Sequence, residues 1–263
     1  VFLLANRYNL IEQTPLEMNS DHAEKILDIS RVLIGQTSIF FPNNGGREAL
    51  QMYLVAGLHR FFHIPLGFTI LKLSTMLVGA LALPFIYRAG KEIGGRRVGF
   101  LAFLFSGVAY WPNVISRVGL RLPFYVLFTA ALLFFLLRGF RLGRRNDFIL
   151  AGVALGLGFY GYSADRLLPL LVLAGFGLYL AHPHGRGIRA HLAVSFLGLV
   201  TASFVIFIPL LRYIVAQPDN FLFRTLTRMG GLEQPLPASP LSILISNYGK
   251  AFTMFSWSGG VVW

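Results

Sequence analysis

The sequence contains no cysteine among its 263 residues. Disulfide bonds, iron–sulfur clusters, thiolate metal sites and cysteine nucleophiles are therefore excluded. Charged residues are also scarce: they make up 13% of the chain, against about 25% in a typical soluble protein, whereas hydrophobic residues make up 55%. This composition predicts an integral membrane protein.

Acidic residues are especially few, with 11 Asp and Glu against 23 Lys and Arg and a net charge of +12. An excess of positive charge is also found in nucleic-acid-binding proteins. Here, however, the basic residues separate apolar runs, and such a pattern reflects membrane topology because Lys and Arg are enriched in cytoplasmic loops. We therefore expect membrane lipids, and no nucleic acid, as partners.

Six uncharged stretches predict membrane-crossing helices, each of which needs about 17 to 25 residues. They are Leu73–Tyr87, Val98–Ser116, Leu122–Leu137, Phe148–Ala164, Leu167–Gly185 and Ala190–Leu211. The two shorter ones are flanked by Lys or Arg, whose long side chains can reach the interface. A helix that ends near Ala5 adds another crossing. The predicted fold is an all-α integral membrane protein, a multi-pass helical bundle with about seven or more crossings.

The segment Ala49–Phe62 is apolar but short, which favours an interfacial helix over a crossing. The basic clusters then share the cytoplasmic side: Arg88, Lys91, Arg96, Arg97, Arg138, Arg141, Arg144, Arg145, Arg186 and Arg189. Residues 6–67 form the first external loop, which contains a further interfacial helix from about His22 to Ile34. We expect one transmembrane module over residues 1–263, located in the plasma membrane (a cell inner membrane), and a longer protein that continues beyond the C-terminus.

Nine of the eleven acidic residues fall on the external side, so any chemistry is expected there. No charged residue lies near the middle of an apolar run, which disfavours an ion pump or ion-coupled transporter. Asp21 could accept a proton from a substrate hydroxyl, or cap the His22–Ile34 helix together with Glu24. Glu48 could bind a divalent cation, orient a hydroxyl or pair with its neighbour Arg47.

Four basic residues on the external side are candidates for binding an anion. Arg117 and Arg121 lie where one predicted crossing ends and the next begins. Two guanidinium groups there could hold a lipid-linked phosphate or anchor the helix ends at lipid headgroups. Arg166 could join the same anion site or neutralise Asp165, and Lys72 is a similar candidate.

Two other patterns receive structural interpretations. His59 and His63 have the spacing of a metal pair, but Pro65 and a position at the bilayer surface favour separate interfacial histidines. The small residues of Gly152–Gly158 suit close helix packing in lipid, and no strand precedes them as a phosphate-binding loop would require.

The succession of these features resembles the GT-C superfamily of polyprenyl-phosphate-sugar-dependent glycosyltransferases, which includes protein O-mannosyltransferases and aminoarabinose transferases. The resemblance begins with Asp21 soon after the first crossing and a Gly-Arg-Glu turn before ALQMYLVAGLHRFF. It continues with LKLSTMLVGALALPFIYRAGKEIGGRRVGFLAFLFSGVAYWPNVISRVGLR and GFYGYSADRLLPL, so that it covers nearly the whole chain.

The resemblance implies an inverting transfer of a hexosyl or pentosyl group from a polyprenyl-phosphate donor to an acceptor hydroxyl on the non-cytoplasmic face. Asp21 is then the catalytic base, and Glu48 helps bind the acceptor or a divalent metal ion. The donor phosphate is faced by Arg117, Arg121 and Arg166. The family often has Asp-Glu where this chain has Asp21-His22, so that a second carboxylate would have to come from Glu24 or Glu48.

Two other functions remain open from the sequence. A catalytically degenerate GT-C-like structural subunit of a larger membrane complex is suggested by the Asp21-His22 departure. A transporter of lipid or small solutes is opposed by the lack of paired broken helices. The acceptor could be a protein, a lipid or a polysaccharide.

Overall fold

The computed structural model describes residue 11 and residues 17–182, 189–229 and 238–253. The chain divides into two compact units, residues 1–216 and 217–263. In the second unit, the described residues form the helices α10 (Pro218–Met229) and α11 (Pro240–Thr253). All candidate site residues belong to the first unit.

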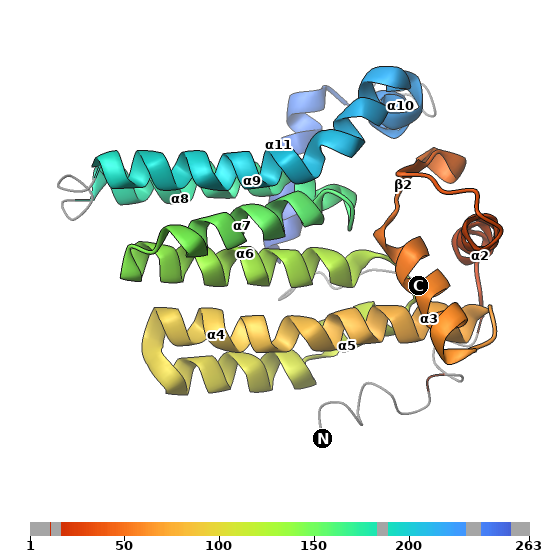
Figure 1. Cartoon of the computed structure of the whole chain (residues 1–263), viewed down its shortest axis with the longest axis horizontal. Helices are drawn as coiled ribbons and strands as arrows, with labels where there is room; N and C mark the ends of the chain where they lie inside the picture. The colour runs from red at the N-terminus through yellow and green to blue at the C-terminus, as the bar shows by residue number, and fades with distance from the viewer. Residues whose placement is uncertain (1–10, 12–16, 183–188, 230–237, 254–263) are drawn as a thin grey trace. The chain divides into compact units, whose positions relative to one another are not determined.

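Long helices lie side by side in the first unit and form a bundle (Figure 1). They are α4 (Phe68–Val108), α6 (Leu122–Leu142), α7 (Arg145–Gly158), α8 (Leu168–Ala181) and α9 (Arg189–Ala216). A core that includes Leu132, Phe148 and Leu199 fills the space between them. A Cβ added at Gly152 of α7 would clash with the carbonyl group of Leu199 in α9. The close-packing interpretation of Gly152–Gly158 is therefore confirmed.

Helix α4 folds back on itself, because Gly94 and Gly95 have non-helical backbone angles. Gly95 has φ of +80°, a conformation that favours glycine. The two arms pack closely: a Cβ added at Gly99 would lie 2.6 Å from the carbonyl oxygen of Tyr87. The second arm ends at the extended residue Ala109, and the short helix α5 (Tyr110–Arg117) follows.

Four helical segments are long and apolar enough to cross a membrane: Phe68–Val108, Leu122–Leu142, Ser163–Ala181 and Arg189–Ala216. The chain is thus a mostly helical membrane protein, but the expected seven crossings are not confirmed. Among the described residues, α7 has only 14, and the predicted stretch Val98–Ser116 is interrupted at Ala109. Counting uncharged residues misses such interruptions because a glycine turn or an extended residue carries no charge. The expected crossing near Ala5 lies outside the described residues.

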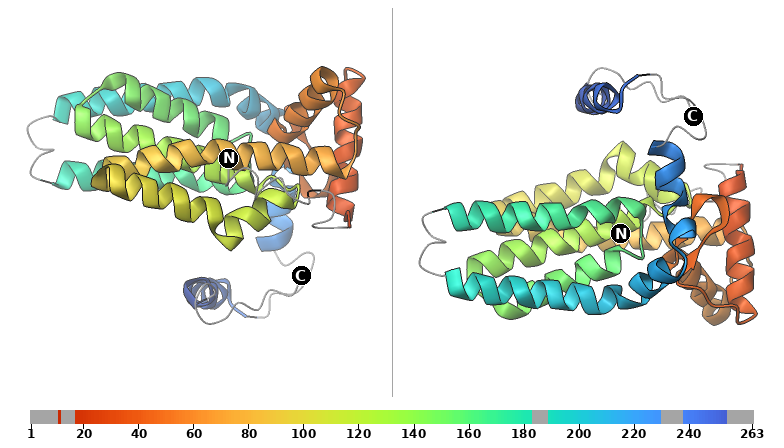
Figure 2. Two further views of the ribbon diagram at one scale, coloured as in Figure 1. Left: turned by 90° about the horizontal axis from the view of Figure 1, so that it is seen from below. Right: turned by 90° about the horizontal axis from the view of Figure 1, so that it is seen from above.

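A small polar module covers one end of the bundle. It begins with α2 (Ser20–Leu33) and ends with α3 (Leu50–Phe62). Between these helices, the short strands β1 (Phe40–Phe41) and β2 (Arg47–Glu48) pair antiparallel, and the 3-10 turn η1 (Asn43–Gly45) connects them. The two helices predicted in this loop are therefore present. Ile29, Met52 and Leu71 pack α2, α3 and α4 together. Helix α2 lies across the end of the bundle, in the orientation that an interfacial helix needs (Figure 2).

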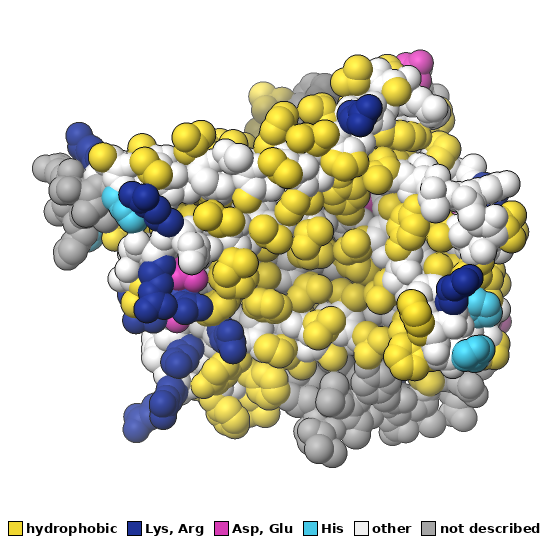
Figure 3. All heavy atoms as spheres, viewed as in Figure 1, with side chains coloured by type: hydrophobic (Ala, Val, Ile, Leu, Met, Phe, Trp, Pro, Cys, Tyr) yellow, Lys and Arg dark blue, Asp and Glu magenta, His cyan; other side chains and the backbone are white. Residues whose placement is uncertain are grey.

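Basic side chains gather at the other end of the bundle (Figure 3). Arg141 in the last turn of α6 pairs with Glu92 of α4 at 2.5 Å, and Arg138 pairs with Asp147 of α7 at 3.6 Å. The first two predicted cytoplasmic clusters therefore lie together. Arg186 of the third cluster lies outside the described residues, and Arg189 begins α9.

Candidate active site

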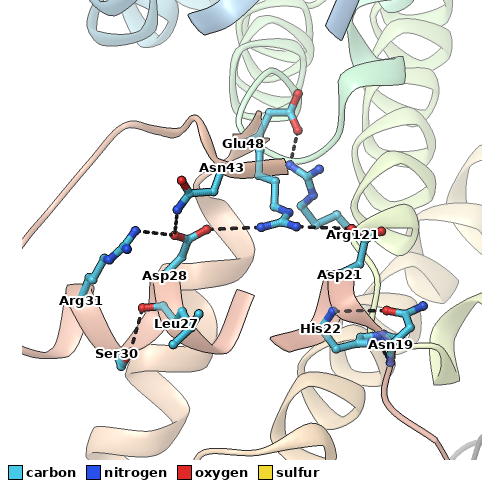
Figure 4. A network of polar contacts seen from close by, with 11 residues as sticks. Asn19, Asp21, His22, Leu27, Asp28, Ser30, Arg31, Asn43, Glu48 and Arg121 are labelled. Atoms are coloured by element: carbon cyan, nitrogen blue, oxygen red, sulfur yellow. Dashed lines mark hydrogen bonds and ion pairs between the residues drawn. The ribbon is translucent and has the colours of Figure 1, made fainter. Parts of the chain in front are cut away.

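Asp21 lies in the first turn of α2, but it does not cap the helix. The cap is Asn19, whose side-chain oxygen accepts the backbone N–H of His22, while the ring of His22 accepts the backbone N–H of Asn19. The capping role considered for Asp21 with Glu24 is therefore wrong. The Asp21 side chain is 48% exposed, and its carboxylate lies 3.3 Å from Nη2 of Arg47 (Figure 4).

Arg47 is the buried centre of an ion-pair network between β2 and α2. Its Nη2 binds Asp21 and its Nη1 lies 3.4 Å from Asp28, which also accepts a hydrogen bond from Asn43 at 3.0 Å. The predicted local pair of Arg47 with Glu48 is thus wrong, because successive residues of an extended strand point to opposite sides. Arg47 reaches α2, which leaves Glu48 to face the bundle.

Glu48 joins two guanidinium groups from distant parts of the chain. Its Oε1 lies 3.0 Å from Nη2 of Arg166 in the turn η2 (Ser163–Leu167), and its Oε2 forms a short ion pair with Arg121 at the start of α6. Glu48 and Arg121 are buried, whereas the Arg166 side chain is 34% exposed. Arg166 therefore pairs with Glu48 and does not neutralise Asp165.

The turn at Val118 and Gly119 is held by three donors from the polar module. Nε2 of His22 lies 2.6 Å from the Val118 carbonyl oxygen, and both Lys25 and Gln51 donate to the Gly119 carbonyl, at 3.1 and 2.9 Å. Because Nδ1 of His22 accepts from Asn19, Nε2 carries the proton. Burial lowers the pKa of His22, which favours this neutral form. His22 thus connects α2 to the turn between Arg117 and Arg121.

Lys25 is a buried amine that the sequence interpretation missed. Burial, together with the nearby guanidinium groups of Arg121 and Arg47, lowers the pKa of Lys25 to about 6, while Asp21 acts in the opposite direction. The charges of Arg121, Arg47 and Asp21 therefore all act on one buried amine. The spacing of Asp21, Lys25 and Asp28 places them on one face of a helix and could have indicated this polar face.

The pKa of Lys25 predicts a pH-dependent stability. Lys25 is neutral above about pH 6 in the folded protein, whereas its ordinary pKa is 10.5. Between these values the unfolded chain binds more protons, so the free energy of unfolding rises with pH, and this contribution is lost as the pH falls towards 6. Between pH 6 and pH 9, the thermal unfolding midpoint of Lys25→Met should rise less than that of the unsubstituted chain. Lys91→Met replaces an exposed lysine and should show the same rise as the unsubstituted chain. An unchanged rise in Lys25→Met would show that Lys25 is not titrating in this range.

The other predicted site residues lie around the same end of the bundle. Lys72, near the start of α4, is buried, donates to the Ile11 carbonyl at 2.7 Å and lies over the Phe68 ring. Arg117 is the last residue of α5, directly before the turn that His22 binds. Glu24 is partly buried on α2. The pKa of Asp28 is raised mainly by the burial of Asp28, and the negative charge of Glu24 adds to this rise.

The described residues contain no group of three His, Asp or Glu side chains that could hold a metal ion. The guanidinium of Arg47 lies between Asp21 and Asp28, the position that a bridging cation would take. These two carboxylates therefore do not fit a divalent metal in this arrangement. A role for Glu48 or Glu24 in binding a metal or the acceptor stays a prediction.

The fold and site define a helical integral membrane protein with carboxylate and guanidinium groups gathered at one end of its bundle. The profile of the dolichyl-phosphate-mannose-protein mannosyltransferase family matches residues 51–213, more than half of the chain. The chain belongs to this family of GT-C-type membrane glycosyltransferases. Lys72, Arg117, Arg121 and Arg166 lie inside the matched range, whereas Asp21 and Glu48 precede it. Neither the curated proteins nor the solved structures contain a significant match.

Proposed function

We propose that this protein transfers a sugar from a polyprenyl-phosphate donor to an acceptor hydroxyl on the non-cytoplasmic face of the membrane, with inversion at the anomeric carbon. The observation that carries the proposal is the pair of ion-pair networks at one end of the bundle, in which Arg47 holds Asp21 and Glu48 joins Arg121 to Arg166. Membership of a mannosyltransferase family supports the same reaction class.

Asp21 is the proposed base. Its half-exposed carboxylate can meet an acceptor, while Arg47, held in turn by Asp28, fixes its position. A carboxylate held in this position can accept the proton of an acceptor hydroxyl.

Arg117, Arg121, Arg166 and Lys72 are the proposed partners of the donor phosphate. Arg121 and Arg166 already meet at Glu48, which brings two guanidinium groups close to one another. A departing phosphate gains negative charge as its bond to the sugar breaks, and fixed guanidinium groups stabilise that charge. Arg166 is the most direct candidate because its side chain is partly exposed beside Glu48.

The bonds and the proton of this reaction are accounted for by the donor, the acceptor and Asp21. The acceptor oxygen forms a bond to the anomeric carbon and gives its proton to Asp21, while the bond from that carbon to the phosphate oxygen breaks. Attack opposite to the departing phosphate inverts the anomeric centre. The non-cytoplasmic face is supported by the position of the site, at the end of the bundle opposite to the basic loops.

Replacing Arg166 tests the phosphate site. We expect Arg166→Gln to lower kcat/KM for a polyprenyl-phosphate sugar about 10- to 100-fold, the effect of losing a hydrogen bond to a charged group. The measurement is release of polyprenyl phosphate by the purified chain in liposomes. Arg145→Gln, at the start of α7 in the basic loops, is the matched control and should transfer normally. Equal rates for both variants would show that Arg166 does not bind the donor phosphate. Absence of transfer by the unsubstituted chain would contradict the proposed function itself.

A further inference from the structure

The C-terminal end of α3 exposes a concentrated apolar surface. Phe61 and Phe62 are 77% and 70% exposed, and Ile34 after α2 is 74% exposed. Adjacent exposed aromatic residues on a polar module are typical of a surface that contacts lipid. This surface is separate from the Asp21 and Glu48 network at the other end of α3.

A hollow of about 340 Å³ lies beside these phenylalanines and is lined by Leu33, His59, Arg60 and His63. Among the described residues, Arg60 has no ion-pair partner. His63 is the only non-glycine residue described with a positive φ, +55°, and Nδ1 of His59 lies 2.8 Å from the Ile64 carbonyl oxygen, which fixes its ring. Histidine and basic side chains lie next to hydrophobic ones at this end of the molecule (Figure 3).

The position of this hollow along the chain places it near the bilayer surface. Phe68, where the first described membrane-length helix begins, comes five positions after His63. Five residue steps can span at most about 18 Å when the chain is fully extended. The headgroup layer lies directly outside the hydrocarbon, so the end of α3 is within reach of lipid phosphates.

We propose that the end of α3 binds the phosphodiester of a membrane phospholipid, with Arg60 and the two histidines at the phosphate and Phe61 and Phe62 among the upper acyl chains. Arg forms strong paired hydrogen bonds to phosphate oxygens. An amphiphile is favoured over free phosphate because the apolar and cationic groups lie side by side. Since β2 directly precedes α3, this contact would hold Arg47 and Glu48 at a fixed depth. The proposal does not depend on sugar transfer.

Lipid retention by the purified full chain tests the proposal. Native mass spectrometry would compare phosphatidylglycerol with the diacylglycerol that has the same acyl chains but no phosphate. The unsubstituted chain should retain phosphatidylglycerol preferentially, and Arg60→Gln should weaken that retention about fivefold, as expected for one basic residue at an anionic surface. Arg31→Gln, an exposed arginine of α2 outside the hollow, is the matched control and should bind normally. Equal retention by Arg60→Gln, or equal competition by inorganic phosphate, would overturn the proposal.

A second measurement examines the apolar half of the site. Because the chain has no cysteine, a nitroxide label on Phe62→Cys is unique. In liposomes, this label should relax faster with dissolved oxygen than with a water-soluble nickel complex. Greater access to the nickel complex would place Phe62 in water and contradict lipid contact.

Discussion

Asp21→Asn is expected to lower sugar transfer about 10²- to 10⁴-fold, the usual contribution of a general base. An amide cannot take the proton of the acceptor hydroxyl, although it can still accept a hydrogen bond from Arg47. Because the Asp21 side chain is 48% exposed, folding should not depend on its charge. The variant should therefore reach the membrane in normal amounts and lose kcat, as measured by transfer from a labelled polyprenyl-phosphate sugar.

Glu17→Gln is the matched control for this substitution. Glu17 is an exposed carboxylate four residues before Asp21, outside helix α2. Glu17→Gln removes one negative charge, as Asp21→Asn does, but it should leave sugar transfer unchanged. Normal transfer by Asp21→Asn would exclude Asp21 as the base, and equal losses in both variants would attribute the effect to local charge alone.

Much of the fold follows from local features of the sequence. Ile26, Ile29 and Leu33 have the spacing of one helix face within the expected helix His22–Ile34, and these side chains pack against α3 and α4. The short apolar segment before Pro65 is a helix of its own, Leu50–Phe62. The number of crossings was less predictable, since it depends on backbone breaks such as Gly94-Gly95 and Ala109.

The pairing within the site could not be read from the sequence in the same way. The partners of Glu48 are 73 and 118 residues away, so only the folded bundle brings them together. The ion pairs expected from the sequence, Arg47 with Glu48 and Arg166 with Asp165, join residues that are neighbours in the chain. They failed because Arg47 and Glu48 of β2 are directed to different helices.

His22 illustrates how a departure from a family pattern can have a structural cause. A carboxylate at this position would be an acceptor facing the Val118 carbonyl, which is also an acceptor. The neutral imidazole instead donates to Val118 and accepts from Asn19. The turn between Arg117 and Arg121 is therefore held from α2 by His22, and this tie links the proposed base to the proposed phosphate site.

Glu48→Gln is expected to be the most destabilising of these substitutions. It removes a buried carboxylate that pairs with Arg121, whose side chain is only 6% exposed. Breaking a buried pair by removing one partner costs about 3–5 kcal/mol, because the remaining charge stays buried. Thermal or denaturant unfolding in detergent should detect a loss of this size, together with a loss of transfer.

The double variant Glu48→Gln with Arg121→Gln separates the buried charge from other effects. Removing both partners should recover much of the lost stability, since the uncompensated guanidinium is gone and Arg166 can turn towards water. Transfer should stay low in the double variant, because Arg121 is proposed to face the donor phosphate. Glu92→Gln breaks the pair with Arg141, whose side chain is 56% exposed and stays solvated without the carboxylate, so this variant should have a smaller effect. If Glu48→Gln unfolds like the unsubstituted chain, Arg121 does not depend on this carboxylate, and the bridge from β2 to α6 is not what holds the site together.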